Sequence, residues 1–167
     1  ADSGVIIWLA KYDKLYLLKS LSGQAIISEK VFNETVVAGK KMGYEDAINT
    51  EKAIARGDIV IKEATVKKEI LKAETRLDIT LGQGEREAIS LALKLKLPLL
   101  TNDEEAALIA EHLGIKTGGM LFILLKAVKE KKLGKAEALN LFQQMLEDGF
   151  WLDPDTVAAF QKKLYEL

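Results

Sequence analysis

Short apolar runs alternate with segments of helical periodicity along this chain, and that alternation constrains the fold more than any other feature. The runs cover residues 24–27, 58–61, 97–100 and 115–117. Runs of this length between helical segments are typical of buried strands joined by helical crossovers. The sequence therefore predicts an α/β fold with a parallel sheet.

The segments between and after these runs are predicted to be helical. Residues 5–21 have a break near Tyr12, a helix carrying Val31 follows the candidate N-cap Ser28, and Gly39 and Gly43 bracket a basic turn. Further helices are predicted at residues 44–56, 66–77, 85–96, 104–112, 120–132, 135–147 and after Asp153, and the 66–77 helix looks exposed. We expect a single domain over residues 1–167, with the helices from about 120 to 167 appended to it.

Composition narrows the chemistry that the chain can perform. It has no Cys and a single His, His112, which excludes a thiolate zinc site and a Cys nucleophile and argues against a His-based triad. Carboxylates must therefore carry most of any catalysis. The net charge of −1 excludes binding of nucleic acid by bulk positive charge. No apolar run approaches the ~18 residues of a membrane span. We also expect no signal peptide, and the lack of Cys fits a cytoplasmic location.

Acids at the ends of the predicted strands are the candidate functional residues, because ligands bind parallel α/β sheets at the carboxyl ends of the strands. Asp103 follows the 97–100 strand and opens the next helix, where its alternative role is that of an N-cap. Asp2 stands just before the first helix with Ser3 beside it, and a cap is again the alternative.

Glu85 opens a helix directly after a Gly-x-Gly turn. At about 100° per residue, it points the same way as Ile89 and Ala92, so it lies at the rim of the apolar face. The other side of this helix carries Arg86, Glu87, Ser90 and Lys94. An inward-pointing acid is costly unless it is paired, hydrogen-bonded or bound to a metal. Glu87 is interpreted as a solvated acid and is the alternative candidate for the site acid on this helix. Glu34, taken alone, is also interpreted as a solvated helix acid.

Together these acids follow a characteristic order: Asp2-Ser3, Glu34 on an early helix, Glu85 opening an apolar helix, and Thr101-x-Asp103 after a strand. This order resembles the PIN-domain ribonuclease family, which includes the toxin halves of many prokaryotic toxin–antitoxin pairs. The resemblance is closest over residues 81–114 and weakest over 40–80. The Gly-Glu-x-Glu-Ala-Ile run and the Leu-Pro-Leu-Leu strand resemble a branch often described only as predicted nucleic-acid-binding PIN proteins.

The resemblance implies a fold as well as an activity. It implies a three-layer α/β/α sandwich, in which a central parallel sheet is flanked by helices. It also places a hydrophobic strand before the first acid, so we expect the numbering to begin inside the natural chain.

The implied activity is hydrolytic cleavage of RNA by metal-activated water, with Asp2, Glu34, Glu85 and Asp103 as the catalytic residues. Clustered carboxylates need compensating positive charge, and oxygen ligands without His or Cys suit Mg²⁺ or Mn²⁺. Asp2, Glu85 and Asp103 are expected to coordinate the metal, and Glu34 to be a further ligand or to position the water. Ser3 and Thr101 are expected to donate hydrogen bonds to these carboxylates.

The resemblance further implies an RNA substrate, a homodimer and, for toxins, an antitoxin protein lying over the acidic site. The basic segments 39–41 and 126–135 are candidate phosphate contacts, although solvated faces have the same composition. The alternative function is a non-catalytic nucleic-acid- or protein-binding module with the same fold. A haloacid-dehalogenase-type phosphatase would need an Asp where Gly4 stands, and the chain has neither a Walker phosphate loop nor a Gly-x-Gly-x-x-Gly fingerprint.

Overall fold

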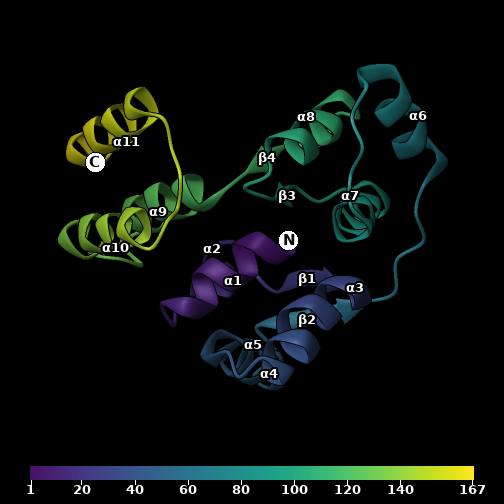
Figure 1. Ribbon diagram of the computed structural model, residues 1–167. Coiled ribbons are helices and arrows are strands. Elements are labelled where there is room, and N and C mark those ends of the chain that lie inside the picture. The colour runs from purple at the N-terminus through teal and green to yellow at the C-terminus, as the bar shows by residue number, and fades with distance from the viewer. The chain divides into compact units, whose positions relative to one another are not determined.

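The computed structural model describes residues 1–167, except for the side chain of Ser22. The chain divides into two compact units, Ala1–Met120 and Leu121–Leu167. The described strands belong to the first unit (Figure 1). All the acids predicted for the site also lie within residues 1–120. The boundary falls where the sequence predicts the appended helices to begin; that both units form one domain stays a prediction.

Helices and short strands alternate in the first unit as the sequence predicts. The strands are β1 (Ala25–Ser28), β2 (Ile59–Lys62), β3 (Leu99–Leu100) and β4 (Thr117–Gly118). The helices are α1 (Ser3–Lys11), α2 (Tyr16–Ser22), α3 (Glu29–Phe32), α4 (Gly39–Lys41), α5 (Glu45–Ala55), α6 (Lys68–Leu77), α7 (Gln83–Leu95) and α8 (Glu104–His112), with a π-helical segment η1 (Asn33–Ala38) between α3 and α4.

The strands form two parallel pairs. β1 pairs with β2 and β3 pairs with β4. The register sets Ala25 opposite Ile59 in the first pair and Leu99 opposite Thr117 in the second. The α/β class with parallel pairing is therefore observed, while a three-layer sandwich around one central sheet stays a prediction.

The first two residues link the two pairs through their backbone. The amino nitrogen of Ala1 donates to the carbonyl of Ile26 in β1 at 2.8 Å. The N–H of Asp2 donates to the carbonyl of Leu100 in β3 at 3.0 Å. Asp2 is consequently held at the carboxyl ends of β1 and β3, which is where a ligand site is expected in a parallel α/β protein.

The segment after β1 differs most from the sequence prediction. Ser28 caps α3 as expected, since its Oγ accepts the N–H of Val31 at 3.2 Å. Gly39, however, does not open a turn but begins α4, where an added Cβ would lie 2.7 Å from Cβ of Ala47. Close packing of α4 on α5 therefore explains this glycine. Gly43, with a φ of 76°, makes the turn.

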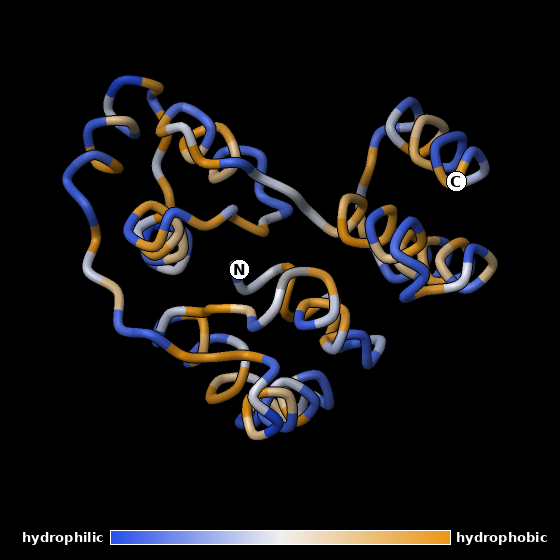
Figure 2. Tube along the Cα trace, turned by 180° about the vertical axis from the view of Figure 1, so that it is seen from behind, coloured by the Kyte–Doolittle hydropathy of each residue, from blue (hydrophilic) through white to orange (hydrophobic). Residues whose placement is uncertain are grey.

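A hydrophobic core joins α6, α7 and α8 to β3. Its fully buried members include Ile70 of α6, Ile89 of α7 and Ile109 of α8. The prediction that helix 66–77 is exposed is therefore wrong for one face, because Ile70 and Ala73 belong to this core. In Figure 2 the helices alternate between apolar and polar residues along their length, as expected when one face packs and the other is solvated.

The second unit consists of helices. They are α9 (Met120–Lys129, which begins at the last residue of the first unit), α10 (Lys135–Glu147) and α11 (Pro154–Glu166). The rings of Phe142 and Phe160 pack with centroids 4.4 Å apart and join α10 to α11. Asp153 caps α11 by accepting the N–H of Thr156 at 2.9 Å, as predicted. None of the helices in the described part of the chain is long and apolar enough to cross a membrane.

Candidate functional site

Asp2 is the most deeply buried of the predicted site acids, with an exposed fraction of 5%. It is the N-cap of α1, and its Oδ1 accepts the N–H of Val5 at 2.9 Å. The capping role that the sequence offered as an alternative is therefore real. It uses only part of the carboxylate, since each of its two oxygens has two lone pairs. Ser3, predicted as a hydrogen-bond donor, is the first residue of the same helix.

The surroundings of Asp2 bring in two other predicted residues. Burial raises the pKa of Asp2, and the negative charge of Glu85 raises it further. Hydrogen bonds from the Thr101 hydroxyl and the Val5 N–H act in the opposite direction without outweighing burial. Asp2, Glu85 and Thr101 therefore lie within electrostatic or hydrogen-bonding reach of one another, although 83 positions of chain separate the two acids.

The Thr101-x-Asp103 motif follows β3 as predicted. Thr101 is buried, and its Oγ1 accepts the N–H of Asp103 at 3.0 Å. The same hydroxyl donates to Asp2, so one side chain connects the loop to the first acid. Asp103 is exposed and caps α8, its Oδ1 accepting the N–H of Ala106 at 2.7 Å. As with Asp2, the cap is real and leaves carboxylate lone pairs available.

Asn102, between these two residues, is oriented by the backbone. Its Oδ1 accepts the N–H of Met120 at 2.8 Å. An added Cβ on Gly119 would lie 2.6 Å from that oxygen, so Gly119 provides the space for this contact. The Nδ2 of Asn102 is buried without a hydrogen-bond partner among the described residues. Through its Oδ1, the amide ties the motif to the backbone of Met120, the last residue of the first unit.

Glu85 lies in the first turn of α7 and is partly buried. Its Oε2 occupies the position that a Cβ on Gly82 would take, so its side chain folds back over the turn that precedes the helix. Ile89 and Ala92, predicted to share its face, are buried. Glu87 instead accepts a hydrogen bond from Gln83 on the exposed side of the helix at 2.9 Å. The geometry thus favours Glu85 over the alternative candidate Glu87.

Glu34 reaches the same region from η1. A Cβ added to Gly84 would lie 3.0 Å from its Oε2, so the Glu34 carboxylate packs against Gly84 in the first turn of α7. It also pairs with Lys30 one turn earlier, with Nζ and Oε1 3.6 Å apart. Glu34 is thus both the partly solvated helix acid that the sequence suggested and a neighbour of Gly84, the residue before Glu85. π-Helical segments are frequent at functional sites.

These placements allow a test of whether the site suits a divalent cation. All the donors are oxygens, which matches hard cations such as Mg²⁺ and Mn²⁺. A buried acid that faces a second acid is also the arrangement that a cation compensates. Among the residues whose side chains are described, however, no three His, Cys, Asp or Glu side chains come close enough together to hold a metal ion. The donor chemistry of Asp2 and Glu85 fits a cation, and a complete ligand set is not assembled.

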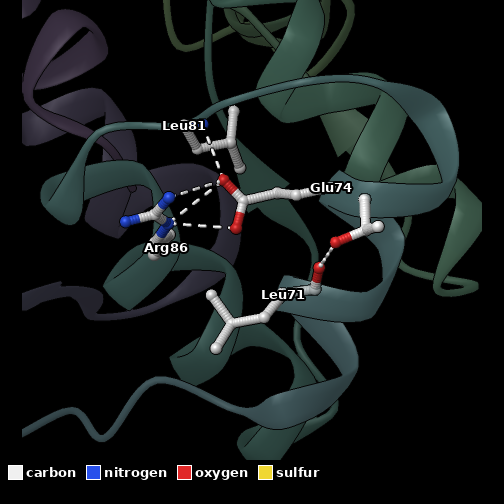
Figure 3. A network of polar contacts seen from close by, with 5 residues as sticks. Leu71, Glu74, Leu81 and Arg86 are labelled. Atoms are coloured by element: carbon white, nitrogen blue, oxygen red, sulfur yellow. Dashed lines mark hydrogen bonds and ion pairs between the residues drawn. The ribbon is translucent and has the colours of Figure 1, made fainter.

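One polar network beside the site was not predicted. Glu74 of α6 is buried and accepts hydrogen bonds from the side chain of Arg86 and from the N–H of Leu81 (Figure 3). Burial raises the pKa of Glu74, but these hydrogen bonds and the charge of Arg86 outweigh it and hold the pKa below its ordinary value. Arg86 and Ser90 therefore do not lie on a purely solvated side of α7: Ser90 is buried and bonds to the N–H of Lys67.

Fold and site together define an α/β protein with parallel strand pairs, in which buried Asp2 lies within electrostatic reach of Glu85. Residues 1–166 match the family DUF3368, described as a PIN domain. No curated protein and no solved structure matches the chain. Because the match covers nearly the whole chain, the protein belongs to the PIN-domain family. PIN domains are generally nucleases and typically use divalent metal ions.

Proposed function

We propose that this protein is a divalent-metal-dependent ribonuclease that uses Mg²⁺ or Mn²⁺. The observation that carries the proposal is the pairing of buried Asp2 with Glu85 at the carboxyl ends of β1 and β3, within a PIN domain. Two acids held this way disfavour each other's ionisation, and the amino group of Ala1 offsets only part of that cost, because burial lowers its own pKa to about 6. A bound cation would remove that cost and place its chemistry where the two acids meet.

Each residue of the site has a role in this proposal. Asp2, Glu85 and Asp103 would hold the cation, directly or through water. When bound, such an ion lowers the pKa of water and stabilises the leaving oxygen of a phosphodiester. Glu34, whose carboxylate lies against Gly84 at the start of α7, would orient the attacking water and accept its proton. Thr101 fixes Asp2 and the backbone of Asp103 through one hydroxyl.

We also propose RNA as the substrate and a homodimer as the assembly, with an antitoxin as a protein partner in a cytoplasmic setting. The family resemblance supports the dimer and the antitoxin. The basic residues of segments 39–41 and 126–135 support contacts to phosphates. With a net charge of −1, RNA binding should be weak and show a modest dependence on salt.

A non-catalytic binding module is the second candidate. The observation that favours it is that the described side chains do not bring three ligating groups together. In that case the protein would keep the PIN fold and bind nucleic acid or protein without cleaving it.

Cleavage of a panel of structured and single-stranded RNAs separates the two candidates. Wild type and Asp103→Asn are compared in Mn²⁺, in Mg²⁺ and in EDTA. We expect cleavage that requires the metal and is lost in the variant; the fold should persist, because Asn caps helices as well as Asp. Cleavage in EDTA, or wild-type rates for Asp103→Asn, would contradict the proposed site. Absence of both cleavage and Mn²⁺ binding in wild type would favour the binding module.

A further inference from the structure

The Glu74–Arg86 pair lies directly behind the turn that presents Glu85. Oε1 of Glu74 accepts the N–H of Leu81 at 2.7 Å, and Nη2 of Arg86 donates to the same oxygen at 2.9 Å. Nε of Arg86 donates to Oε2 at 3.0 Å. Both carboxylate oxygens are therefore used, and the pair holds the end of α6 against the start of α7. Bidentate charge-assisted contacts of this kind fix direction as well as distance.

The contacts continue from Glu74 to Glu85 without a break. Leu81, fixed by Glu74, is followed by Gly82, the N-cap of α7. The carbonyl of Gly82 accepts the N–H of Arg86 at 3.1 Å, so Arg86 holds the turn through its backbone as well as through its side chain. The carboxylate of Glu85 folds back onto Gly82. Any movement of the turn would therefore carry the carboxylate of Glu85 with it.

We infer that Glu74 and Arg86 are positioning residues that hold the Glu85 carboxylate in place for cation binding. This inference rests on the proposed function, because it concerns the same acids. Groups that hydrogen-bond to metal ligands are needed for full metal affinity even though they do not touch the ion. Glu74 and Arg86 do not contact the Glu85 carboxylate directly; they fix the backbone of the turn against which that carboxylate folds.

The competing explanation is that the pair only stabilises the fold. A second ion pair in the same unit provides a matched control. Asp58 is buried like Glu74, and it pairs with Nε of Arg56 at 3.0 Å and with Nζ of Lys19 at 3.2 Å. It lies immediately before β2, at the amino end of the strands, and contacts none of the predicted site acids in these interactions. Disrupting it should affect stability without affecting the site.

The test measures the affinity of the full chain for Mn²⁺ alone, from the decrease of the electron paramagnetic resonance signal of free Mn²⁺. The stability of each variant is measured by urea denaturation. The variants are Arg86→Lys, which keeps the charge but loses the planar bidentate geometry, and Glu74→Gln/Arg86→Met, which removes both charges and so avoids an unpaired buried carboxylate. The control is Asp58→Asn/Arg56→Met.

We expect Mn²⁺ affinity to fall by roughly tenfold in both Arg86 variants, with the double variant still folded and the control binding Mn²⁺ like wild type. Wild-type affinity in folded Arg86 variants would overturn this inference alone. An equal loss in the control would overturn it too, because the effect would then follow general destabilisation. If wild type itself bound no Mn²⁺, the proposed function would fail and this inference with it.

Discussion

Asp2 and Glu74 are buried to nearly the same degree, 5% and 6% exposed, yet their pKa values move in opposite directions. Burial raises the pKa of both. For Glu74, Arg86 and the N–H of Leu81 outweigh that effect and the pKa falls. For Asp2, burial is the largest effect and the charge of Glu85 adds to it, while the hydrogen bonds of Thr101 and Val5 and the Ala1 amino group oppose it without outweighing it, so the pKa rises.

We interpret this difference as the one between a structural acid, Glu74, and the proposed functional acid, Asp2. Glu74 has its counter-charge in the fold, so its negative form is the stable one. Asp2 is held in a costly state by the hydrogen bonds of the Thr101 hydroxyl and the Val5 N–H. Acids whose pKa is raised by burial and by a specific charged neighbour are candidates for functional sites. Substitutions at Asp2 should therefore affect RNA cleavage more than stability, and substitutions that disrupt the Glu74–Arg86 pair should mainly affect stability.

The largest effect is expected from Asp2→Asn. Because a bound cation contributes several kcal/mol of transition-state stabilisation, losing this ligand should slow RNA cleavage on the order of a thousandfold. Stability should hold or rise, since Asn keeps the cap and removes a charge that faces Glu85. Cleavage rates and urea midpoints measure the two effects. A clear loss of stability with wild-type cleavage would reverse the assignment of Asp2.

Arg86→Met should have the opposite effect to Asp2→Asn, because its main consequence should be a loss of stability. It leaves Glu74 buried and without its cation, which costs about 3 kcal/mol, at the lower end of the range because the Arg86 side chain is 27% exposed. Urea denaturation measures the change. Adding Glu74→Gln should recover most of it, and a double variant as unstable as Arg86→Met would show that the carboxylate is not the cause.

The pH dependence of stability should differ between wild type and Glu74→Gln. Because the pKa of Glu74 is lower in the folded chain than its ordinary 4.5, the ionised acid stabilises the fold above that pH. This contribution is lost as the pH falls below 4.5 and through the pKa that Glu74 has in the folded chain. Wild type should therefore lose more stability than the variant over this pH range. Urea unfolding at pH 7, 5, 4 and 3 tests this, and parallel curves would contradict it.

Gly84→Ala should have the smallest effect. The new Cβ would lie 3.0 Å from Oε2 of Glu34, so that carboxylate must move away from the start of α7. Since Ala favours the helix, stability should change by no more than about 1 kcal/mol, while cleavage should fall a few-fold. Gly134→Ala, at the N-cap of α10, is the control and should cleave normally. Wild-type cleavage by Gly84→Ala would remove Glu34 from the site.

Much of this fold follows from local pattern. Ser28, Asp103 and Asp153 cap their helices as their positions suggest, because capping depends only on the next three residues. The inward direction of Glu85 follows from the helical period in the same way. The order of the acids along the chain also indicated which residues meet, and the structure brings Asp2, Glu85 and Thr101 together.

The features that were missed depend on distance in the sequence or on packing. Glu74 and Arg86 are 12 residues apart on two helices, and each resembles an ordinary solvated residue on its own helix. Gly39 looked like a turn because its tight contact with Ala47 arises only when α4 packs on α5. The π-helical segment that carries Glu34 has no local signature in the sequence, and four short strands do not reveal whether they form one sheet or two pairs.

The most direct test of the account is the melting temperature of wild type, Asp2→Asn and Glu74→Gln, each with and without saturating Mn²⁺. A ligand that binds only the folded chain stabilises it, by about 2.7 kcal/mol at a concentration 100 times its dissociation constant. The account predicts that Mn²⁺ raises the melting temperature of wild type and Glu74→Gln but not of Asp2→Asn. An equal rise in the melting temperature of all three proteins, or no rise for wild type, would contradict the claim that Asp2 binds the cation.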